Sequence, residues 1–283
     1  MPRALIAGCG YLGRALADLL AAEGWEVEGW TQSSESAHEL SGCGVRAKAV
    51  DISDREDIAT HSSDFEAVVH CASTRGGAPD SYRRVYLNGV RNLLEHFRSE
   101  RFVFVSSTSV YGQNKGEWVS EDSPAEPKHE TGKVLRDSED LALEKGGTAI
   151  RLGGLYGPDR SALLRKFTNG EARIDPENDR FINQVHRDDA AAAIKFLLRR
   201  GESIRQIYNL VDNEPTLLSD CYRWLATRLN RPLPASGKSI SMRKRGESNK
   251  RVSNAKLRSL GWAPQYPTFA DGMEKSVLLT TVD

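Results

Sequence analysis

Three glycines near the start of the chain, Gly8, Gly10 and Gly13, have the spacing of a phosphate-binding turn. Apolar residues before them predict a β-strand, and apolar residues at helical spacing after them predict a helix whose N-terminus faces the phosphates. In such a unit the first glycine allows a tight turn, the second lets the backbone approach a diphosphate, and the third lets the helix pack against the strand. The predicted dinucleotide-binding residues of this turn are Gly8, Gly10, Tyr11, Leu12, Gly13 and Arg14.

Two other interpretations of this turn are an ordinary glycine turn and a site for S-adenosylmethionine. A methyltransferase usually has an acidic residue just before the glycines and a third glycine two positions after the second. Those positions hold Ile6 or Ala7, and Leu12, in this chain. The residues therefore favour a dinucleotide over S-adenosylmethionine.

The second predicted strand, Trp25 to Trp30, ends without the acidic residue that NAD-preferring sites usually carry there to bind the ribose hydroxyls. A missing carboxylate removes the repulsion against a 2′-phosphate. We therefore expect NADP to be preferred over NAD, with Gln32, Ser33 and Arg14 as candidate contacts. The alternative is that these polar residues form a plain solvated turn.

Further candidate contacts follow two more predicted strands. Asp51 and Ile52 come after the strand from Val45 to Val50, where a carboxylate would meet the adenine amino group; alternatively, Asp51 caps the next helix. Ala72 lies at the end of the strand from Phe65 to Ser73. Because ligands bind outside the carboxyl ends of parallel strands, these residues and the glycine turn are expected at one edge of the sheet.

A run of hydroxyl side chains, Ser106 to Ser109, follows the predicted strand from Arg101 to Val105. A hydroxyl at the carboxyl end of a strand can hydrogen-bond a substrate carbonyl or alcohol, which is the electrostatic help that hydride transfer needs. The structural alternative is that the serine satisfies local backbone groups.

The alternation of strands and helices predicts an α/β fold, a Rossmann-type doubly wound parallel sheet with a small C-terminal α/β substrate lobe. Residues 1–153 form the predicted dinucleotide-binding domain, to which 187–211 return, and 154–186 and 212–283 form the lobe. The other predicted elements are strands at Thr148–Leu152 and Gln206–Val211, and helices at Asp80–Ser99, Asp188–Arg200, capped by an acidic pair, and Leu217–Leu229.

The composition excludes several partners. The chain has 283 residues with 39 basic and 39 acidic side chains, so no general attraction to nucleic acid or to an anionic membrane is expected. It has neither an apolar run of transmembrane length nor a signal-peptide pattern, which favours a cytoplasmic protein. The four cysteines, Cys9, Cys43, Cys71 and Cys221, match no metal spacing and are expected to be reduced thiols.

Six motifs in register resemble the extended short-chain dehydrogenase/reductase superfamily, in its NAD-dependent epimerase/dehydratase group. They are the glycine turn and the segments 106–112, 151–158, 185–191, 208–212 and 251–262. The missing spacer residue in the glycine turn matches the atypical subgroup. The resemblance implies NADP or NAD as cofactor, a sugar-like or other polar substrate in the lobe, and a homodimer formed through two long helices of the Rossmann domain.

The resemblance also implies a catalytic set of Ser/Thr, Tyr and Lys. Ser107 matches the catalytic serine, but the only register that supplies a lysine for the family's Tyr-x-x-x-Lys is His129 to Lys133, with histidine in the tyrosine's place. Residues i and i+4 share a helix face, so both would point into the cleft. Lys133 would hold the nicotinamide ribose. His129 would exchange the proton with the substrate, since an imidazole pKa of about 6.5 suits that role.

Other departures support a different interpretation, a non-catalytic module that senses the NADP(H) ratio. Besides the lost tyrosine, Tyr86 stands where the family often has an asparagine that relays water. The segment from Lys238 to Arg258 carries eight basic residues and one acid, which indicates either a pocket for an anionic substrate or a solvated face. His186 to Asp189 is expected to cap the Ala-rich helix and to tie the lobe to the sheet, with catalysis by His186 as the alternative.

Overall fold

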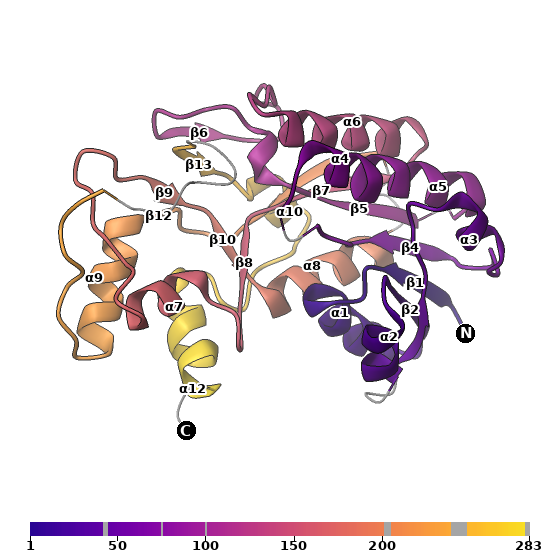
Figure 1. Ribbon diagram of the computed structural model, residues 1–283, viewed down its shortest axis with the longest axis horizontal. Coiled ribbons are helices and arrows are strands. Elements are labelled where there is room, and N and C mark those ends of the chain that lie inside the picture. The colour runs from indigo at the N-terminus through magenta and orange to yellow at the C-terminus, as the bar shows by residue number, and fades with distance from the viewer. Residues whose placement is uncertain (42–44, 75, 100, 201–204, 239–247, 281–283) are drawn as a thin grey trace.

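A computed structural model describes residues 1–41, 45–74, 76–99, 101–200, 205–238 and 248–280 (Figure 1). Its centre is a seven-stranded sheet in the order β11-β7-β5-β4-β1-β2-β3, with every neighbouring pair parallel. The strands are β1 (Arg3–Ala7), β2 (Glu26–Thr31), β3 (Arg46–Ala49), β4 (Ala67–His70), β5 (Arg101–Ser107), β7 (Thr148–Leu152) and β11 (Ile207–Leu210). The strand order reverses between β1 and β4, which confirms the predicted doubly wound α/β fold.

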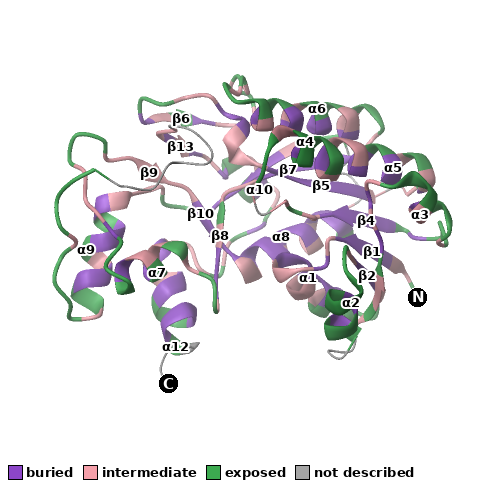
Figure 2. Cartoon of the chain, in the orientation of Figure 1, coloured by how far each residue is buried: buried purple, intermediate pink, exposed green. Residues whose placement is uncertain are grey.

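Helices cover both faces of this sheet (Figure 1). One face carries α1 (Tyr11–Ala21), α2 (Ser34–Ser41) and α8 (Arg187–Arg199). The other carries α3 (Arg55–Ala59), α4 (Pro79–Tyr82), the π-helical turn η1 (Arg83–Asn88), α5 (Gly89–His96) and α6 (Glu130–Glu144). The strands between them are buried, while the outer sides of α5 and α6 are exposed (Figure 2).

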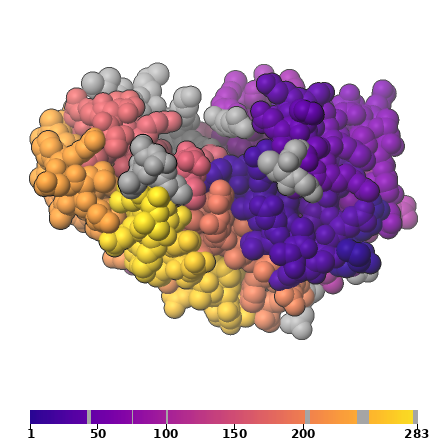
Figure 3. Space-filling model, turned by 90° about the horizontal axis from the view of Figure 1, so that it is seen from below, coloured from indigo at the N-terminus to yellow at the C-terminus, as the bar shows by residue number. Residues whose placement is uncertain are grey.

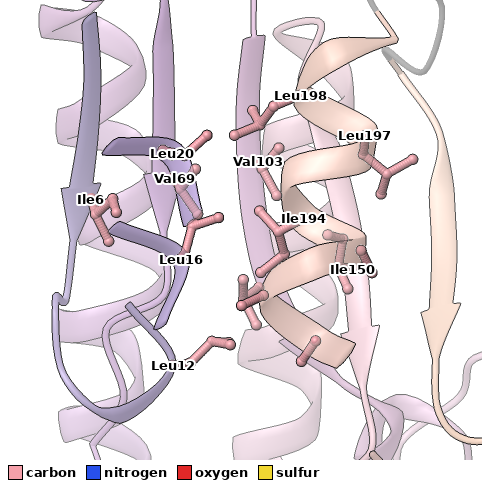
Figure 4. Packing of buried hydrophobic residues seen from close by; sticks show 14 of the residues in the cluster. Ile6, Leu12, Leu16, Leu20, Val69, Val103, Ile150, Ile194, Leu197 and Leu198 are labelled. Carbon is pink, nitrogen blue, oxygen red and sulfur yellow. The ribbon is translucent and has the colours of Figure 1, made fainter. Parts of the chain in front are cut away.

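The first face is held by the packing of α1 and α8 on the sheet (Figure 4). Leu12, Leu16 and Leu20 recur at every fourth residue of α1, so they form one apolar stripe. Ile194, Leu197 and Leu198 of α8 face the same core. This packing fixes the start of α1, and with it the glycine turn, at the carboxyl end of β1.

The predicted helix from Asp80 to Ser99 is present as α4, η1 and α5, with a wider turn in its middle. The carbonyl of Val85 in η1 lies 2.9 Å from Nε2 of His70, at the end of β4, and Tyr86 stacks on the His70 ring. Tyr86 is buried, and its hydroxyl lies 3.4 Å from that of Ser73. The residue that replaces the family's asparagine is therefore a packing residue of the sheet edge.

The second half of the chain builds a lobe at the carboxyl ends of the strands, on the left of Figure 1. Its elements are β8 (Gly154–Tyr156), α7 (Ala162–Thr168), β9 (Phe181–Ile182), β10 (Gln184–His186), β12 (Thr216–Leu217), α9 (Leu218–Arg228), α11 (Phe269–Gly272), η3 (Met273–Val277) and α12 (Leu278–Thr280). The helices α7, α9, α11 and η3 form its own core. The short elements η2 (Thr108–Val110), β6 (Glu117–Val119) and β13 (Lys250–Val252) lie between lobe and sheet, and α10 (Ala255–Ser259) packs beside β11.

The boundaries of the lobe differ from the predicted ones in one segment. Leu257 of α10 and Trp262 belong to the core between the sheet, α1 and α8. Part of the predicted lobe segment 212–283 therefore packs on the dinucleotide-binding domain. Sequence patterning missed this because a short apolar helix looks the same whichever core it joins.

A buried ion pair joins α6 to β7 beneath the site. The guanidinium of Arg151 donates to both carboxylate oxygens of Glu139, with Nη2 to Oε2 at 2.8 Å, and Ser106 Oγ donates to Oε1 at 2.6 Å. The Glu139 side chain is 0% exposed and that of Arg151 2%. Buried charges of this kind are tolerated because each is compensated by the other.

We predict that Arg151→Met lowers the free energy of unfolding by about 3–5 kcal/mol, because it leaves the Glu139 carboxylate buried without its partner. Arg136 also contacts Glu139, at 3.4 Å, but from the partly exposed side of α6. Arg136→Met is the matched control and should cost less than about 1 kcal/mol. Urea unfolding of both variants checks this, and equal losses would contradict it.

His186 closes the junction between lobe and sheet. Its Nδ1 accepts from the backbone N–H of Asp188 at 3.2 Å, so this ring caps α8, and Nε2 lies 3.0 Å from Ser276 Oγ. The cap is the histidine and not the predicted acidic pair, because Asp189 turns to accept from the backbone of Gln265 and Tyr266. The expectation for the segment His186 to Asp189 is thus confirmed in the capping by His186, whereas the prediction of an acidic cap is wrong.

Burial lowers the pKa of His186 to about 4, with Arg187 adding to the effect and Asp188 opposing it. The unfolded chain, with an imidazole pKa near 6.5, binds the proton first as pH falls. We therefore predict that the neutral ring contributes to the free energy of unfolding above pH 6.5. This contribution, on the order of 2–3 kcal/mol, is lost as the pH falls from 6.5 to 4. His186→Asn keeps a capping side chain without titrating, so chemical unfolding across that window should show a flatter pH dependence. Identical profiles would contradict this assignment.

Candidate functional site

The glycine turn packs against the residues that follow β4, the strand beside β1 in the sheet. Gly8 has φ +91°, and a Cβ placed on it would lie 2.1 Å from the backbone nitrogen of Ala72. A Cβ on Gly13 would lie 2.9 Å from the Gly8 carbonyl, whereas one on Gly10 would meet nothing within 4 Å. Two of the glycines thus serve close packing, and Gly10 faces open space. This arrangement fits a diphosphate, which needs unobstructed backbone at the start of a helix.

The end of β2 is polar and open. Gln32 and Ser33 are exposed, and Ser33 Oγ accepts from the backbone N–H of Ser36 at 3.2 Å, at the start of α2. Of the two acidic residues of this strand, Glu26 begins it and pairs with Arg46, and Glu28 is 4% exposed and is bonded to Trp30 and Lys48. Glu28 lies within the strand and is already paired. The edge where a ribose would bind has no carboxylate from the end of β2, as predicted.

Asp51 lies beyond β3 at the same edge. Its Oδ1 accepts from both the backbone and the hydroxyl of Ser53, while Oδ2 lies 4.0 Å from the guanidinium of Arg84. The alternative prediction that Asp51 caps the following helix is wrong, because Asp54 caps α3. Ile52 is buried, and its carbonyl accepts from the Asn92 side chain at 3.1 Å. Contact of Asp51 with an adenine stays a prediction.

The two serines at the end of β5 have different surroundings. Ser106 points to the buried Glu139. Ser107 is half-buried, and its Oγ accepts from the backbone N–H of Ser109 at 3.2 Å, which caps η2. That hydroxyl keeps its proton for another acceptor. Ser107 therefore combines the structural role of a cap with a donor at the carboxyl edge of the sheet.

His129 and Lys133 lie on the outer side of α6. His129 is the N-cap of the helix: its carbonyl accepts from the Lys133 backbone N–H at 3.1 Å, but its own backbone is extended, φ −101° and ψ 145°, so it is not a helical residue. The Lys133 side chain is 55% exposed and pairs with Glu130 at 2.7 Å. Within the described ranges neither residue shares a hydrogen bond or ion pair with Ser107. The structure therefore shows no direct bond that links the three predicted catalytic residues, and their joint role stays a prediction.

The side of α6 that faces the site carries different residues. Val134, Leu135, Ser138, Glu139 and Ala142 are its buried positions. One turn earlier this stripe reaches Gly132, where a Cβ would lie 3.6 Å from the Ser109 carbonyl. The apolar spacing of this helix is a signal already present in the sequence, and it places residue 133 on the side opposite these buried positions.

The predicted anion pocket falls partly on residues 239–247, which lie outside the described residues. Of the basic residues that are described, Lys250 is 3% exposed and donates to the Tyr111 carbonyl at 3.2 Å. Burial, with a contribution from Arg180, lowers the pKa of Lys250 to about 8. Arg251 donates to the Gly116 carbonyl and lies over the rings of Trp118 and Phe181. These side chains are largely engaged with the protein itself.

A contact between the glycine turn and the lobe crosses the site. Tyr11, the first residue of α1, donates from its hydroxyl to the Pro158 carbonyl at 2.9 Å. The guanidinium groups of Arg160 and Arg187 each lie 5.1 Å from the centre of the Tyr11 ring. Figure 3 shows the surface indented between the lobe at the left and the dinucleotide-binding domain at the right. Tyr11 is a predicted cofactor contact, whereas Arg160 and Arg187 are not among the predicted site residues.

The described residues hold no group of three or more His, Cys, Asp or Glu side chains placed to bind a metal ion. Cys9, Cys71 and Cys221 are free thiols, and Cys43 lies outside the described residues. Burial raises the pKa of Cys9 to about 12, which keeps it protonated. No helix in the described part of the chain is both long and apolar enough to cross a membrane.

A parallel sheet with a glycine turn where the strand order reverses defines a dinucleotide-binding Rossmann protein. The sequence model of the NAD dependent epimerase/dehydratase family matches residues 4–210. The chain belongs to this family. The resemblance stated from the six motifs is thereby confirmed.

Three comparisons illustrate the relationship. Protein YeeZ of Escherichia coli (strain K12) is 31% identical over 279 residues, which cover 94% of this chain and 97% of YeeZ. A solved structure from Methylobacillus flagellatus, named for the same family, is 31% identical with a TM-score of 0.81 over 100% of this chain and 99% of its own. The UDP-glucose 4-epimerase of Thermus thermophilus, solved with NAD, is 22% identical with a TM-score of 0.79 over 96% of each chain. At that identity the likeness shows the fold alone.

Proposed function

We propose that this protein binds a nicotinamide dinucleotide at the glycine turn and catalyses hydride transfer at a carbinol or carbonyl carbon of a polar, sugar-like substrate. The observation that carries the proposal is the packing of Gly8 on Ala72, which leaves Gly10 as open backbone at the start of α1. When bound, the nicotinamide ring supplies or accepts the hydride. The absence of a free carboxylate at the end of β2 favours NADP over NAD.

Ser107 is the residue that we assign to the substrate oxygen. Its hydroxyl lies at the carboxyl end of β5, and it accepts from the Ser109 amide, which leaves its own proton available to a substrate. A hydrogen bond from Ser107 stabilises negative charge that develops on the substrate oxygen. His129 as proton carrier and Lys133 as ribose contact remain hypotheses, since both would have to turn inward from the exposed side of α6.

The second candidate function is a sensor of the NADP(H) ratio without turnover. One observation favours it: the lysine that should hold the nicotinamide ribose is exposed and paired with Glu130, while Leu135 occupies the buried face of α6. A binding module needs the glycine turn but needs neither a proton carrier nor a substrate pocket. Both functions share the cofactor site and differ in turnover.

The cofactor site predicts different outcomes for two neighbouring glycines. Gly10→Ala should leave stability nearly unchanged and weaken dinucleotide binding by roughly tenfold or more, because the new methyl group occupies the open space and blocks backbone hydrogen bonds to phosphate. Gly8→Ala should lower the free energy of unfolding by roughly 2 kcal/mol or more, since its φ is positive and Ala72 blocks the Cβ. Thermal unfolding and titration calorimetry check the pair. Unchanged affinity in Gly10→Ala would contradict the assignment.

Titration calorimetry with NAD, NADH, NADP and NADPH, followed by hydride exchange with sugar nucleotides, separates enzyme from sensor. For an enzyme, Ser107→Ala should slow exchange by roughly 100-fold with dinucleotide affinity unchanged, because one donor to the developing charge is lost. Ser109→Ala, two residues away, is the matched control and should retain the rate. Turnover that survives His129→Ala removes the histidine from the mechanism. Tight binding without exchange by the unmodified protein identifies a sensor.

A further inference from the structure

The lobe meets the glycine turn at an aromatic side chain, Tyr11. Its hydroxyl donates to the Pro158 carbonyl, and a Cβ on Gly157 would lie 2.6 Å from the same hydroxyl. Asp159, next in this turn, has a left-handed φ of 59°, which is unfavourable for a residue other than glycine. The turn from Gly157 to Arg160 is therefore held tightly against the first residue of α1.

Two cations accompany this contact. The guanidinium groups of Arg160, from the lobe, and Arg187, from the start of α8, each lie 5.1 Å from the Tyr11 ring centre. Arg187 also donates to Asp188 at 2.8 Å. Arg160 is exposed and has no ion-pair partner in the part of the chain that the structure describes. Arg160 thus makes no direct ion pair within these residues, and Asp159, its neighbour in the chain, is the acidic side chain beside the cluster.

The start of α1 adds positive potential and no negative charge. Gly10, the N-cap, has no side chain to accept from the helix, and the first turn of α1 carries no acidic residue. Aligned peptide dipoles make such a helix end favourable for an anion. Positive charge therefore reaches the start of α1 from two other elements, the turn after β8 and α8, and the acidic side chains that oppose it there are Asp159 and Asp188.

We infer that Arg160 and Arg187 complete the dinucleotide site from the lobe side, binding the diphosphate that the glycine turn holds from the sheet side. This inference rests on the proposed cofactor site and names two residues that add to it. Tyr11 keeps both guanidinium groups beside the turn through its ring and fixes the lobe through its hydroxyl. A bound diphosphate thereby bridges the two halves of the protein.

The test measures affinity, so it needs no knowledge of the substrate. NADPH and NADH fluorescence titrations should give a dissociation constant about tenfold higher for Arg160→Ala than for the unmodified protein, because a charge-assisted hydrogen bond is lost. Arg187→Ala should weaken binding in the same direction. Arg160→Lys keeps the charge and should recover most of the affinity. Arg165→Ala, an exposed arginine on α7 of the same lobe, is the matched control and should bind normally.

A second measurement addresses the source of the effect. The difference in dissociation constant between Arg160→Ala and the unmodified protein should shrink in about 1 M salt, because exposed charges are then screened within about 3 Å. Adenosine, which lacks the diphosphate, should bind both proteins equally. The inference would be overturned if Arg160→Ala and Arg187→Ala bound NADPH and NADH as tightly as the unmodified protein does. That result would leave the proposed function intact. An unmodified protein that binds no dinucleotide would instead refute the proposed function.

Discussion

The contact between Gly8 and Ala72 is the constraint on which the site depends. Parallel strands β1 and β4 lie side by side, and the chain leaves them in opposite directions, so a crevice forms between their carboxyl ends. The glycine backbone fills the bottom of that crevice so closely that no side chain fits there. What remains open is the space beside Gly10 and the start of α1. The shape of the proposed cofactor site is thus set by how tightly two strands and one helix pack.

Buried polar groups fix the elements of the sheet edge beside this crevice. The Glu139–Arg151 pair fixes α6 to β7, and the Arg151 guanidinium lies 4.7 Å from the ring of Tyr111. The Tyr111 hydroxyl in turn donates to Asn209 of β11. Hydrogen bonds of this kind are directional, and an unpaired member costs free energy, so they specify one position for the neighbouring elements. The site edge is therefore held by more than apolar packing.

The arrangement of α6 has consequences for how the chemistry is understood. The resemblance to the family implies a tyrosine and a lysine on this helix that face the cofactor. Here the buried stripe of α6 is apolar except where Ser138 and Glu139 are bonded to the protein, and Lys133 faces outward. The glycine turn and the fold are those of the family, whereas α6 lacks the tyrosine and the inward-facing lysine that the resemblance implies. Turnover and sensing are therefore the two functions that remain open for one binding geometry.

The sequence by itself determined the elements whose signals are local. The glycine turn, the strands before and after it, the Ala-rich helix and the six motifs were all predicted, because alternation, helical spacing and glycine conformation act over a few residues. Only the tertiary structure decided which way α6 faces, that His186 rather than an acidic pair caps α8, and that Leu257 and Trp262 join the sheet core. The same holds for Arg160, which lies 149 positions along the chain from Tyr11 and beside it in space. Such contacts depend on packing between distant segments, and packing leaves no signature in the spacing of neighbouring residues.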